Sequence, residues 1–257
     1  MTAAQPRPWA MRGDFLVPVS FAALTSIVFL ILSVYSESNG TLHQPLRAES
    51  PSLKPIIPIK KRADIAHVLE SESLRVGVEL GVKKGEFSQE ILSRWPSCSK
   101  YVLVDLWTPQ VNYKDLANVD QKTHDSFLEK SRENLRPFQN KLEVCRNYTS
   151  VCVHLYPDNF FDFVYVDARH DYKGVLQDLQ LWWPKLKPGG VLGGHDYVTN
   201  DEGPKQSGQD WSINYDGSVD PQGRAVKGAV DEFSTAFGRQ ILVTYQDSGF
   251  PSWFLRK

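Results

Sequence analysis

Two short polar segments carry the side chains best suited to chemistry. One begins at Asp167 and reads Asp-Ala-Arg-His-Asp-Tyr; the other begins at His195 and reads His-Asp-Tyr. Carboxylates, completed by water and substrate oxygens, are the ligands that Mg²⁺ prefers. Asp167 and Asp196, with His195 beside the latter, therefore predict a divalent-cation site. A cation there would lower the pKa of an acceptor hydroxyl and orient it. His170 is the candidate general base, because an imidazole accepts a proton near neutral pH.

Each of these residues also has a purely structural interpretation. His195 can hydrogen-bond the edge of a sheet, and Asp171 can cap a helix that begins at Lys173. A single histidine or aspartate would favour that interpretation. Both motifs are expected at the tips of neighbouring strands, and this combination favours a functional site.

A second feature is the turn at residues 79–85, which reads Glu-Leu-Gly-Val-Lys-Lys-Gly. Glycine lets a backbone approach a ligand closely, and a helix that follows presents free N–H groups. By itself this spacing is equally typical of a plain turn. Glu79 beside the turn, and Asp105 at the end of the next apolar run, favour a nucleoside-type cofactor, because such an acid can accept ribose hydroxyls.

The elements that must position these side chains alternate between strand and helix from Ala63 onward. Helices are expected near 65–69 and at 87–95, 123–135, 175–186 and 226–237. Strands are expected at 74–80, 101–105, 141–145, 161–167, 191–194, 241–245 and 253–255. This order predicts an α/β fold with a mainly parallel sheet that helices cover on both faces. Ligands bind such sheets outside the carboxyl ends of the strands.

Four motifs resemble those of class I S-adenosylmethionine (SAM)-dependent methyltransferases. They are Glu-x-Gly-x-x-x-Gly after the first strand, the acid that ends the second, Phe-Asp-Phe-Val-Tyr-Val-Asp at 161–167 and Leu-Lys-Pro-Gly-Gly at 186–190. The resemblance covers nearly everything from Leu74 to the C-terminus. It implies a Rossmann-like, doubly wound, seven-stranded sheet with a closing antiparallel strand. A dinucleotide dehydrogenase would carry Gly-x-Gly-x-x-Gly, but Lys83 occupies the second glycine position.

The same resemblance implies which residues border the cofactor. They are Glu79, Gly81, Gly85, Asp105, Asn147, Tyr148 and Asp167. The glycine turn and its acid would line the methionine end of SAM, Asp105 would hold the ribose, and Asn147 and Tyr148 would contact the adenine.

The two polar segments are similar in particular to the metal-dependent O-methyltransferases of the macrocin O-methyltransferase type, which methylate sugar hydroxyls. This resemblance implies that Asp167, His195 and Asp196 hold Mg²⁺ or Mn²⁺, that His170 is the base, and that the acceptor is a hydroxyl of a sugar or glycan. The sequence departs from the family at His195, where glutamate is more common. A nitrogen ligand there favours manganese over magnesium.

The N-terminal quarter predicts a membrane anchor. Residues 15–35 form an uncharged apolar run of 21 residues, long enough as a helix to span the roughly 30 Å bilayer core. A cleaved signal peptide is the alternative, although its apolar region is normally shorter. We therefore expect a cytoplasmic tail at 1–14, a transmembrane signal anchor at 15–35, a Pro/Ser-rich stem at 36–62 and the methyltransferase domain at 63–257.

Charge around this run predicts its orientation. Arg7 and Arg12 precede it, and the next basic residue is Arg47, so the positive-inside rule favours type II topology with a lumenal domain, as in many Golgi enzymes. Glycosylation sequons begin at Asn39 and Asn147 and agree with that placement.

Composition narrows the remaining function classes. The formal net charge is −1, so no general basic field recruits nucleic acid. The three cysteines lack zinc-ligand spacing; Cys145 and Cys152 either pair or stay free. The composition is compatible with a homo-oligomer and does not decide the oligomeric state. The alternatives are an O-methyltransferase of small phenols or catechols and an inactive SAM-fold binding module, the latter disfavoured by the joint presence of Asp167, His170 and Asp196.

The segment from Tyr197 to Arg224 is polar and glycine-rich and contains Trp211 and Tyr215. Long loops at the carboxyl edge of a sheet commonly serve as lids or acceptor sites. Aromatic faces in this loop would suit sugar stacking, and they equally suit the packing of the loop itself.

Overall fold

A computed structural model describes residues 56, 58–247 and 249–257. The predicted tail, the transmembrane segment at 15–35 and most of the predicted stem lie outside these residues. Within the described part of the chain, no helix is both long and apolar enough to cross a bilayer.

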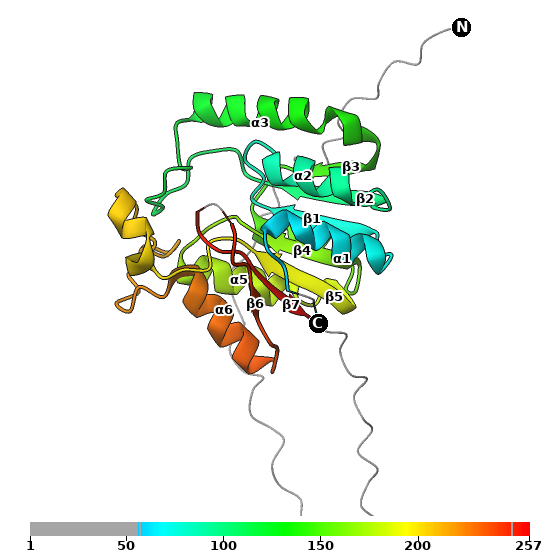
Figure 1. Cartoon of the computed structure of the whole chain (residues 1–257). Helices are drawn as coiled ribbons and strands as arrows, with labels where there is room; N and C mark the ends of the chain where they lie inside the picture. Colours follow the sequence, from blue (N-terminus) through cyan, green and yellow to red (C-terminus); the bar gives the residue numbers. More distant parts are fainter. Residues whose placement is uncertain (1–55, 57, 248) are drawn as a thin grey trace, which may run out of the picture. The chain divides into compact units, whose positions relative to one another are not determined.

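A seven-stranded sheet forms the centre of the domain (Figure 1). Its strands are β1 Val76–Leu80, β2 Lys100–Val104, β3 Leu142–Cys145, β4 Phe161–Val166, β5 Leu186–Gly194, β6 Leu242–Val243 and β7 Trp253–Arg256. They lie in the order β3-β2-β1-β4-β5-β7-β6. The first five are mutually parallel, and β7 runs antiparallel to β5 and β6. The structure thus confirms the expected doubly wound sheet, whose order reverses between β1 and β4.

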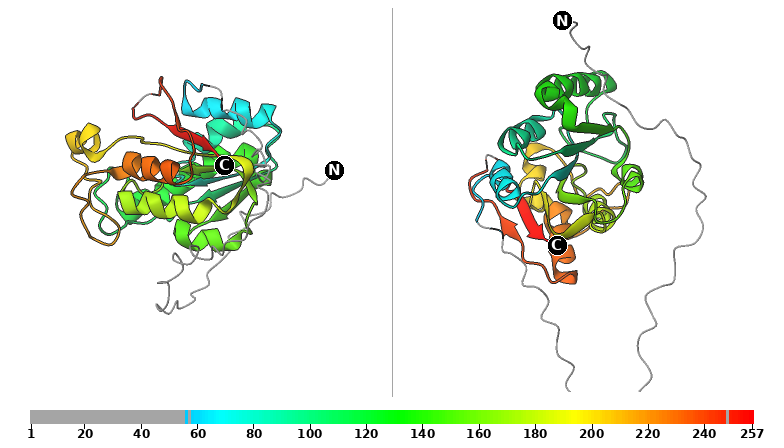
Figure 2. Two further views of the ribbon diagram at one scale, coloured as in Figure 1. Left: turned by 90° about the horizontal axis from the view of Figure 1, so that it is seen from below. Right: turned by 90° about the vertical axis from the view of Figure 1, so that its right-hand side faces the viewer.

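Helices cover both faces of the sheet (Figures 1 and 2). The α-helices are α1 Ile65–Ser71, α2 Glu86–Arg94, α3 Gln121–Leu135, α4 Thr149–Cys152, α5 Tyr172–Trp182 and α6 Ala225–Ala236. One apolar cluster packs α1, α2 and α3 against one face, and a second packs α4, α5 and α6 against the other. Strand side chains alternate between these clusters, so Val78 and Leu80 face α5 whereas Glu79, between them, faces α2. Short 3₁₀ helices lie at Arg62–Asp64, Arg136–Lys141, Val153–Leu155, Asn200–Glu202 and Pro204–Ser207.

Strand β5 begins earlier than the sequence predicts. The Lys-Pro-Gly-Gly segment, expected only to stop the preceding helix, belongs to the strand. A register irregularity between Phe161 and Phe163 of β4 accommodates it. Gly189 adopts a φ of +79°, and a side chain at Gly190 would lie 2.9 Å from the carbonyl oxygen of Asp162. These two glycines let the chain enter the sheet next to a proline.

The folded domain also begins earlier than Ala63. Ile59 is only 2% exposed and packs in the cluster beneath α1 and α2. The carbonyl oxygen of Lys60 accepts a hydrogen bond from the backbone N–H of Gln246. Ile59 of the predicted stem is therefore part of the domain core, and the exposed Lys60 is tied to the domain through its backbone.

Candidate active site

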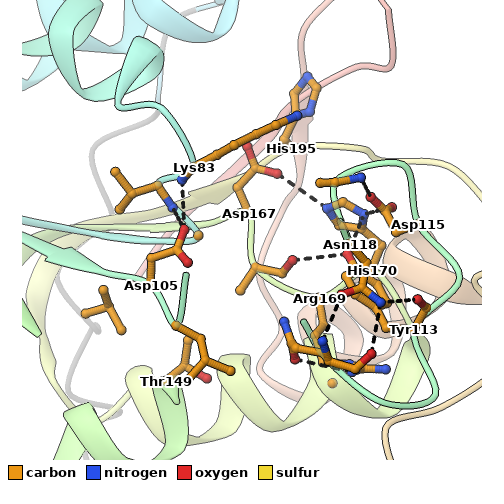
Figure 3. A pocket seen from close by; sticks show the side chains of 18 of the residues that line it. Lys83, Asp105, Tyr113, Asp115, Asn118, Thr149, Asp167, Arg169, His170 and His195 are labelled. Carbon is orange, nitrogen blue, oxygen red and sulfur yellow. Dashed lines mark hydrogen bonds and ion pairs between the residues drawn. The ribbon is translucent and has the colours of Figure 1, made fainter. Parts of the chain in front are cut away.

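A cavity of about 730 Å³ opens at the carboxyl edge of the sheet (Figure 3). Its walls come from the turn after β1, the segments that follow β2, β3, β4 and β5, and the loop residues Tyr113, Asp115 and Trp211. This position, across the reversal of strand order, is where α/β sheets bind ligands. Its volume is in the range of small-molecule and cofactor sites.

Gly81 brings the turn after β1 against the start of the β4 loop. Its φ is +87°, and an added Cβ would lie 1.9 Å from the carbonyl oxygen of Asp167. Its N–H donates to the carbonyl oxygen of Val104 on β2. Only glycine fits this close approach of two backbones. Gly81 therefore borders the cavity, as expected, and also sets the distance between the turn and Asp167.

Gly85 has a different position. It has a φ of +70° at the N-terminal cap of α2, and an added Cβ would lie 2.9 Å from Leu135 Cδ1 on α3. It is not among the cavity-lining residues in the described part of the chain. Its contact with α3 accounts for a glycine here, and its expected contact with SAM stays a prediction.

Asp105 holds the glycine turn from the end of β2. Its Oδ2 accepts hydrogen bonds of 2.8 Å from the backbone N–H groups of Val82 and Lys83. Its Oδ1 accepts another from the N–H of Trp107. A carboxylate oxygen has two lone pairs, so Oδ1 retains capacity for one further donor such as a ribose hydroxyl. The expected ribose acid therefore also shapes the turn, which the sequence did not reveal.

Glu79 is a buried carboxyl group at the methionine end proposed from the sequence. It lines the cavity, and its Oε2 accepts hydrogen bonds from the hydroxyls of Ser88 on α2 and Tyr101 on β2. Burial raises its pKa to about 8, although the hydrogen bond from Ser88 opposes the shift. Near neutral pH this carboxyl group therefore holds a proton for much of the time.

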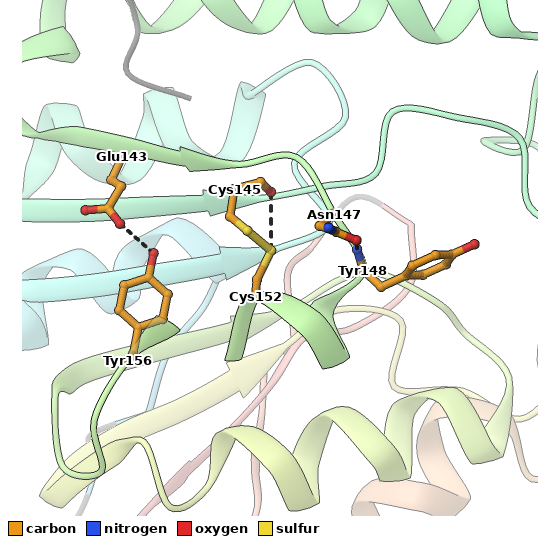
Figure 4. The surroundings of a disulfide bond; sticks show 6 residues. All are labelled: Glu143, Cys145, Asn147, Tyr148, Cys152 and Tyr156. Carbon is orange, nitrogen blue, oxygen red and sulfur yellow. Dashed lines mark hydrogen bonds between the residues drawn. A yellow bond between two sulfur atoms is a disulfide. The ribbon is translucent and has the colours of Figure 1, made fainter. Parts of the chain in front are cut away.

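A disulfide brackets the expected adenine loop (Figure 4). Cys145 ends β3 and Cys152 ends α4, and both are buried. Asn147 and Tyr148 lie between them and line the cavity, and their expected contact with adenine stays a prediction. The pairing that the sequence left open is therefore present, and it restrains the loop that forms this part of the cavity.

Two carboxylates and one imidazole converge at the opposite end of the cavity. Ligand atoms of Asp167, His170 and Asp196 all lie within 4.8 Å of one another. The Nε2 atom of His170 lies 3.2 Å from Asp196 Oδ2 and 3.5 Å from Asp167 Oδ1. This nitrogen is buried and makes no hydrogen bond of acceptable geometry with any of the described residues. A buried polar atom without such a bond, aimed at two carboxylates, fits a small cation or an acceptor hydroxyl between them.

The other ring nitrogen of His170 is held by Asp115. Nδ1 lies 3.0 Å from Asp115 Oδ2 and 3.1 Å from the hydroxyl of Tyr113. A carboxylate only accepts, so Nδ1 carries the proton in this pair. Burial opposes charge on both groups, but Asp196 and Asp115 hold the pKa of His170 well above its usual value, and the His170 hydrogen bond helps lower the pKa of Asp115 to about 2.

His195 lies beside this group but is not part of it. Its Nδ1 is 2.8 Å from Oδ1 of Asp196, and its backbone oxygen accepts a hydrogen bond from Trp253 Nε1. The structure therefore brings His170 together with Asp167 and Asp196, whereas the sequence grouped His195 with them. Asp196 itself adopts a φ of +56°, a conformation that costs a non-glycine residue energy and is enriched at functional sites.

Three residues of the site were not singled out from the sequence. Tyr113 and Asp115 lie in the irregular loop after β2, which carries no periodic signal. Arg169, on the β4 loop, holds that loop by donating from Nη2 to the carbonyl oxygen of Asn112, and its guanidinium lies over the Tyr113 ring. Asp171 caps α5 by accepting from the N–H of Gly174, as its structural interpretation predicted.

The aromatic residues of the long loop differ in accessibility. Trp211 is buried against the imidazole of His170 and donates from Nε1 to Asp115 Oδ2. Trp211 therefore packs the long loop against His170 and Asp115. Tyr215 lines the cavity and is 40% exposed, so it is the one of the two with a face available to a ligand.

The donor set fits a nucleoside cofactor and a divalent cation in neighbouring parts of one cavity. The Gly81 turn with Asp105 and the loop of Asn147 and Tyr148 surround one region, and the carboxylates of Asp167 and Asp196 lie beyond them. Residues 78–197 match the family described as a methyltransferase domain. The match covers 120 of the 257 residues of the chain.

Solved structures share the fold of this methyltransferase domain. The O-methyltransferase TomG from Streptomyces achromogenes, in complex with SAM, is 15% identical over 80% of this chain and 82% of its own, with a TM-score of 0.51. Cofactor-bound Rv0187 from MTB is 14% identical over 79% and 82%, with a TM-score of 0.50. A Corynebacterium glutamicum protein is 10% identical over 76% and 79%, with a TM-score of 0.51.

Among curated proteins, none matches the sequence. The family match nevertheless confirms the class recognised from the sequence motifs. The chain carries a class I SAM-dependent methyltransferase domain, and the expected enzyme class is confirmed with it.

Proposed function

We propose that this methyltransferase is a divalent-metal-dependent O-methyltransferase, which moves the methyl group of SAM to a hydroxyl of its acceptor. The convergence of Asp167, His170 and Asp196 beside the cofactor end of one cavity carries the proposal. Such a group is suited to activating an oxygen nucleophile. The similarity in fold to TomG, itself an O-methyltransferase, agrees with it.

Bound SAM would supply an electrophilic methyl group. The turn at Gly81 and the buried Glu79 would border its methionine end, Asp105 would accept from its ribose, and the loop of Asn147 and Tyr148 would enclose its adenine. These residues bind and orient, and the transfer then gains chiefly from the alignment of the methyl group with the acceptor oxygen.

Asp167 and Asp196 would hold Mg²⁺ or Mn²⁺, which supplies Lewis-acid activation of the acceptor hydroxyl. His170 would accept the hydroxyl proton at Nε2, the nitrogen that faces both carboxylates. Asp115 fixes the ring by accepting from Nδ1–H, so Nε2 is the nitrogen that faces the acceptor. A cation held by Asp167 and Asp196 would offset the negative charge that raises the pKa of His170, and Nε2 could then accept the proton near neutral pH. His195 stays a candidate ligand through its contact with Asp196.

Three measurements on the full-length protein in mild detergent test this function. SAM binding is measured by calorimetry, and methyl transfer from labelled SAM is measured with and without EDTA. Asp196→Asn should lower transfer at least a hundredfold, because the cation loses a charged ligand. The control Asp201→Asn, at a side chain 72% exposed, should leave transfer unchanged. Transfer that persists in EDTA and in the Asp196 variant would refute the metal-dependent mechanism.

The role of His170 is tested separately. His170→Ala should lower the rate of methyl transfer by about 10²- to 10⁴-fold if the residue is a general base. Metal affinity, measured by calorimetry with Mn²⁺, should stay within about threefold of the original. A large loss of Mn²⁺ affinity would instead make His170 a ligand, which its distance to both carboxylates also permits.

A glycan hydroxyl is the acceptor that we propose first, together with a Golgi-lumenal domain on a type II anchor. The Cys145–Cys152 disulfide supports that placement, because disulfides persist in oxidising compartments. Protease protection of the domain in sealed secretory vesicles tests the orientation, and digestion without detergent would refute it.

A phenol or catechol is the second candidate acceptor. The rim of the cavity favours it, because Val111 and Leu116 are 80% and 70% exposed and Tyr215 lies on the same wall. Such apolar side chains suit a ring more than a hydroxyl-rich sugar. Labelled transfer to a panel of free glycans and phenols decides between the two classes.

A further inference from the structure

Arg62 is a cation at the methionine end of the cavity. It comes from the last residues of the predicted stem and lines the same cavity as Glu79 and Gly81. The guanidinium carbon lies 5.2 Å above the ring of Phe87. The backbone N–H of Arg62 donates to Asp247 Oδ1 at 2.8 Å. Contacts therefore hold both the backbone and the side chain of this residue.

Among the described residues, the guanidinium forms one ion pair, a long one with Asp167. Its Nη1 lies 3.6 Å from Asp167 Oδ2, beyond the usual length of a hydrogen bond. The nearby Glu79 is protonated for much of the time near neutral pH, because burial raises its pKa to about 8. Asp167 is also a proposed ligand of the cation, whose charge would offset the attraction of this carboxylate for Arg62. A largely buried guanidinium in this position is suited to an anion that enters with the ligand.

The amino-acid end of SAM offers such an anion. It is a zwitterion with one carboxylate and one ammonium group. Arg62 and Glu79 form a matching pair at one end of the cavity, because the first is a cation and the second is an acceptor that ionises next to a positive charge. Guanidinium groups bind carboxylates through two parallel hydrogen bonds, which provides specificity as well as affinity.

We propose that Arg62 recognises the carboxylate of the methionine moiety of SAM, so that a residue from the first turn of the folded domain completes its cofactor site. This inference rests on the proposed cofactor. It extends the site beyond residues 78–197, which match the family, and it assigns the binding of the carboxylate to a side chain from outside that match.

The test compares two ligands that differ by the carboxylate alone. SAM and decarboxylated SAM share the adenosine, the sulfonium and the amine. Their dissociation constants are measured by calorimetry on the full-length protein in mild detergent, with EDTA present so that metal binding does not contribute. The variants are Arg62→Ala and Arg62→Lys, with Arg94→Ala as the matched control. Arg94 is also an arginine of this face, but it pairs with Asp64 and Glu90 on the outer side of α2.

Arg62→Ala should weaken SAM binding about ten- to hundredfold, as expected for the loss of a hydrogen-bonded charge pair. It should change the affinity for decarboxylated SAM less than threefold. Arg62→Lys should fall between the wild type and Arg62→Ala, because it keeps the charge but not the planar fork, and Arg94→Ala should match the wild type with both ligands.

Equal losses for both ligands in Arg62→Ala would overturn the assignment, since the residue would then only support the fold. Unchanged affinity for SAM would overturn it as well. A wild-type protein that binds neither ligand would instead contradict the proposed cofactor. Thermal unfolding of each variant identifies any loss of folded protein, and Arg62→Lys keeps the test decisive if the alanine variant does not fold.

Discussion

Replacement of Glu79 by glutamine should make the stability of the domain less dependent on pH. Burial raises the pKa of this carboxyl group from 4.5 to about 8. Below pH 4.5 it is protonated whether the chain is folded or unfolded. Between pH 4.5 and 8 the unfolded chain releases the proton and the folded chain keeps it. The free energy of unfolding therefore decreases as the pH rises. Above pH 8 the loss is complete.

The size of the effect follows from the two pKa values. At about 1.36 kcal/mol for each pH unit, the interval from 4.5 to about 8 corresponds to an upper bound of about 5 kcal/mol. Glu79→Gln removes the ionisation and keeps an oxygen that accepts from Ser88 and Tyr101. We expect the variant to be about 2 to 5 kcal/mol more stable than the wild type at pH 9 and nearly equal to it at pH 5.

Urea unfolding of both proteins at pH 5, 7 and 9, without SAM, measures this difference. Glu133→Gln is the control, because its carboxylate lies on the surface of α3 and is 60% exposed. Parallel pH dependence in the wild type and Glu79→Gln would show that the folded protein binds no extra proton at Glu79. A slope that remains in the variant is expected from Asp178, whose pKa burial raises to about 7.

Two further predictions concern the framework of the cavity. Gly81→Ala should destabilise the fold by more than about 4 kcal/mol, because its Cβ would overlap the carbonyl oxygen of Asp167. Gly189→Ala, with a similar φ and nothing within 4 Å of the new Cβ, should cost only about 1 to 2 kcal/mol; equal losses in urea unfolding would contradict the steric argument. Cys152→Ser should cost about 2 to 3 kcal/mol by opening a short loop and should weaken SAM binding in calorimetry. Unchanged SAM affinity would mean that the disulfide does not shape the adenine loop.

The sheet was predictable because its strands are short apolar runs separated by glycine and proline signals. Each of the seven expected runs overlaps an observed strand. The difference is the Lys-Pro-Gly-Gly segment of β5. Its proline and glycines predict the end of a helix and not a strand. Only its pairing with β4 and the C-terminal strand makes it extended, and long-range pairing leaves no local sequence signal.

The site residues that directly follow a strand could be predicted from the sequence. Asp105, Asp167 and Asp196 were identified because parallel strands bring their carboxyl ends to one edge. Asp115 and Tyr113 were not, since they reach His170 from an irregular loop more than 50 residues away in sequence. The choice between His170 and His195 was also beyond the sequence, because it depends on side-chain direction in adjacent loops.

The position at which the folded domain begins decides where a protease can release it without removing core residues. Ile59 is a core residue, and the exposed Lys60 and Lys61 precede Arg62 directly. A protease that cuts before Ile56 would shed a domain that keeps both Ile56 and Ile59, which pack in its core. A trypsin-like protease that cuts after Arg62 would leave the buried Ile59 and the arginine on the discarded piece. Two cleavage sites a few residues apart would thus release an enzyme in one case and an incomplete domain in the other.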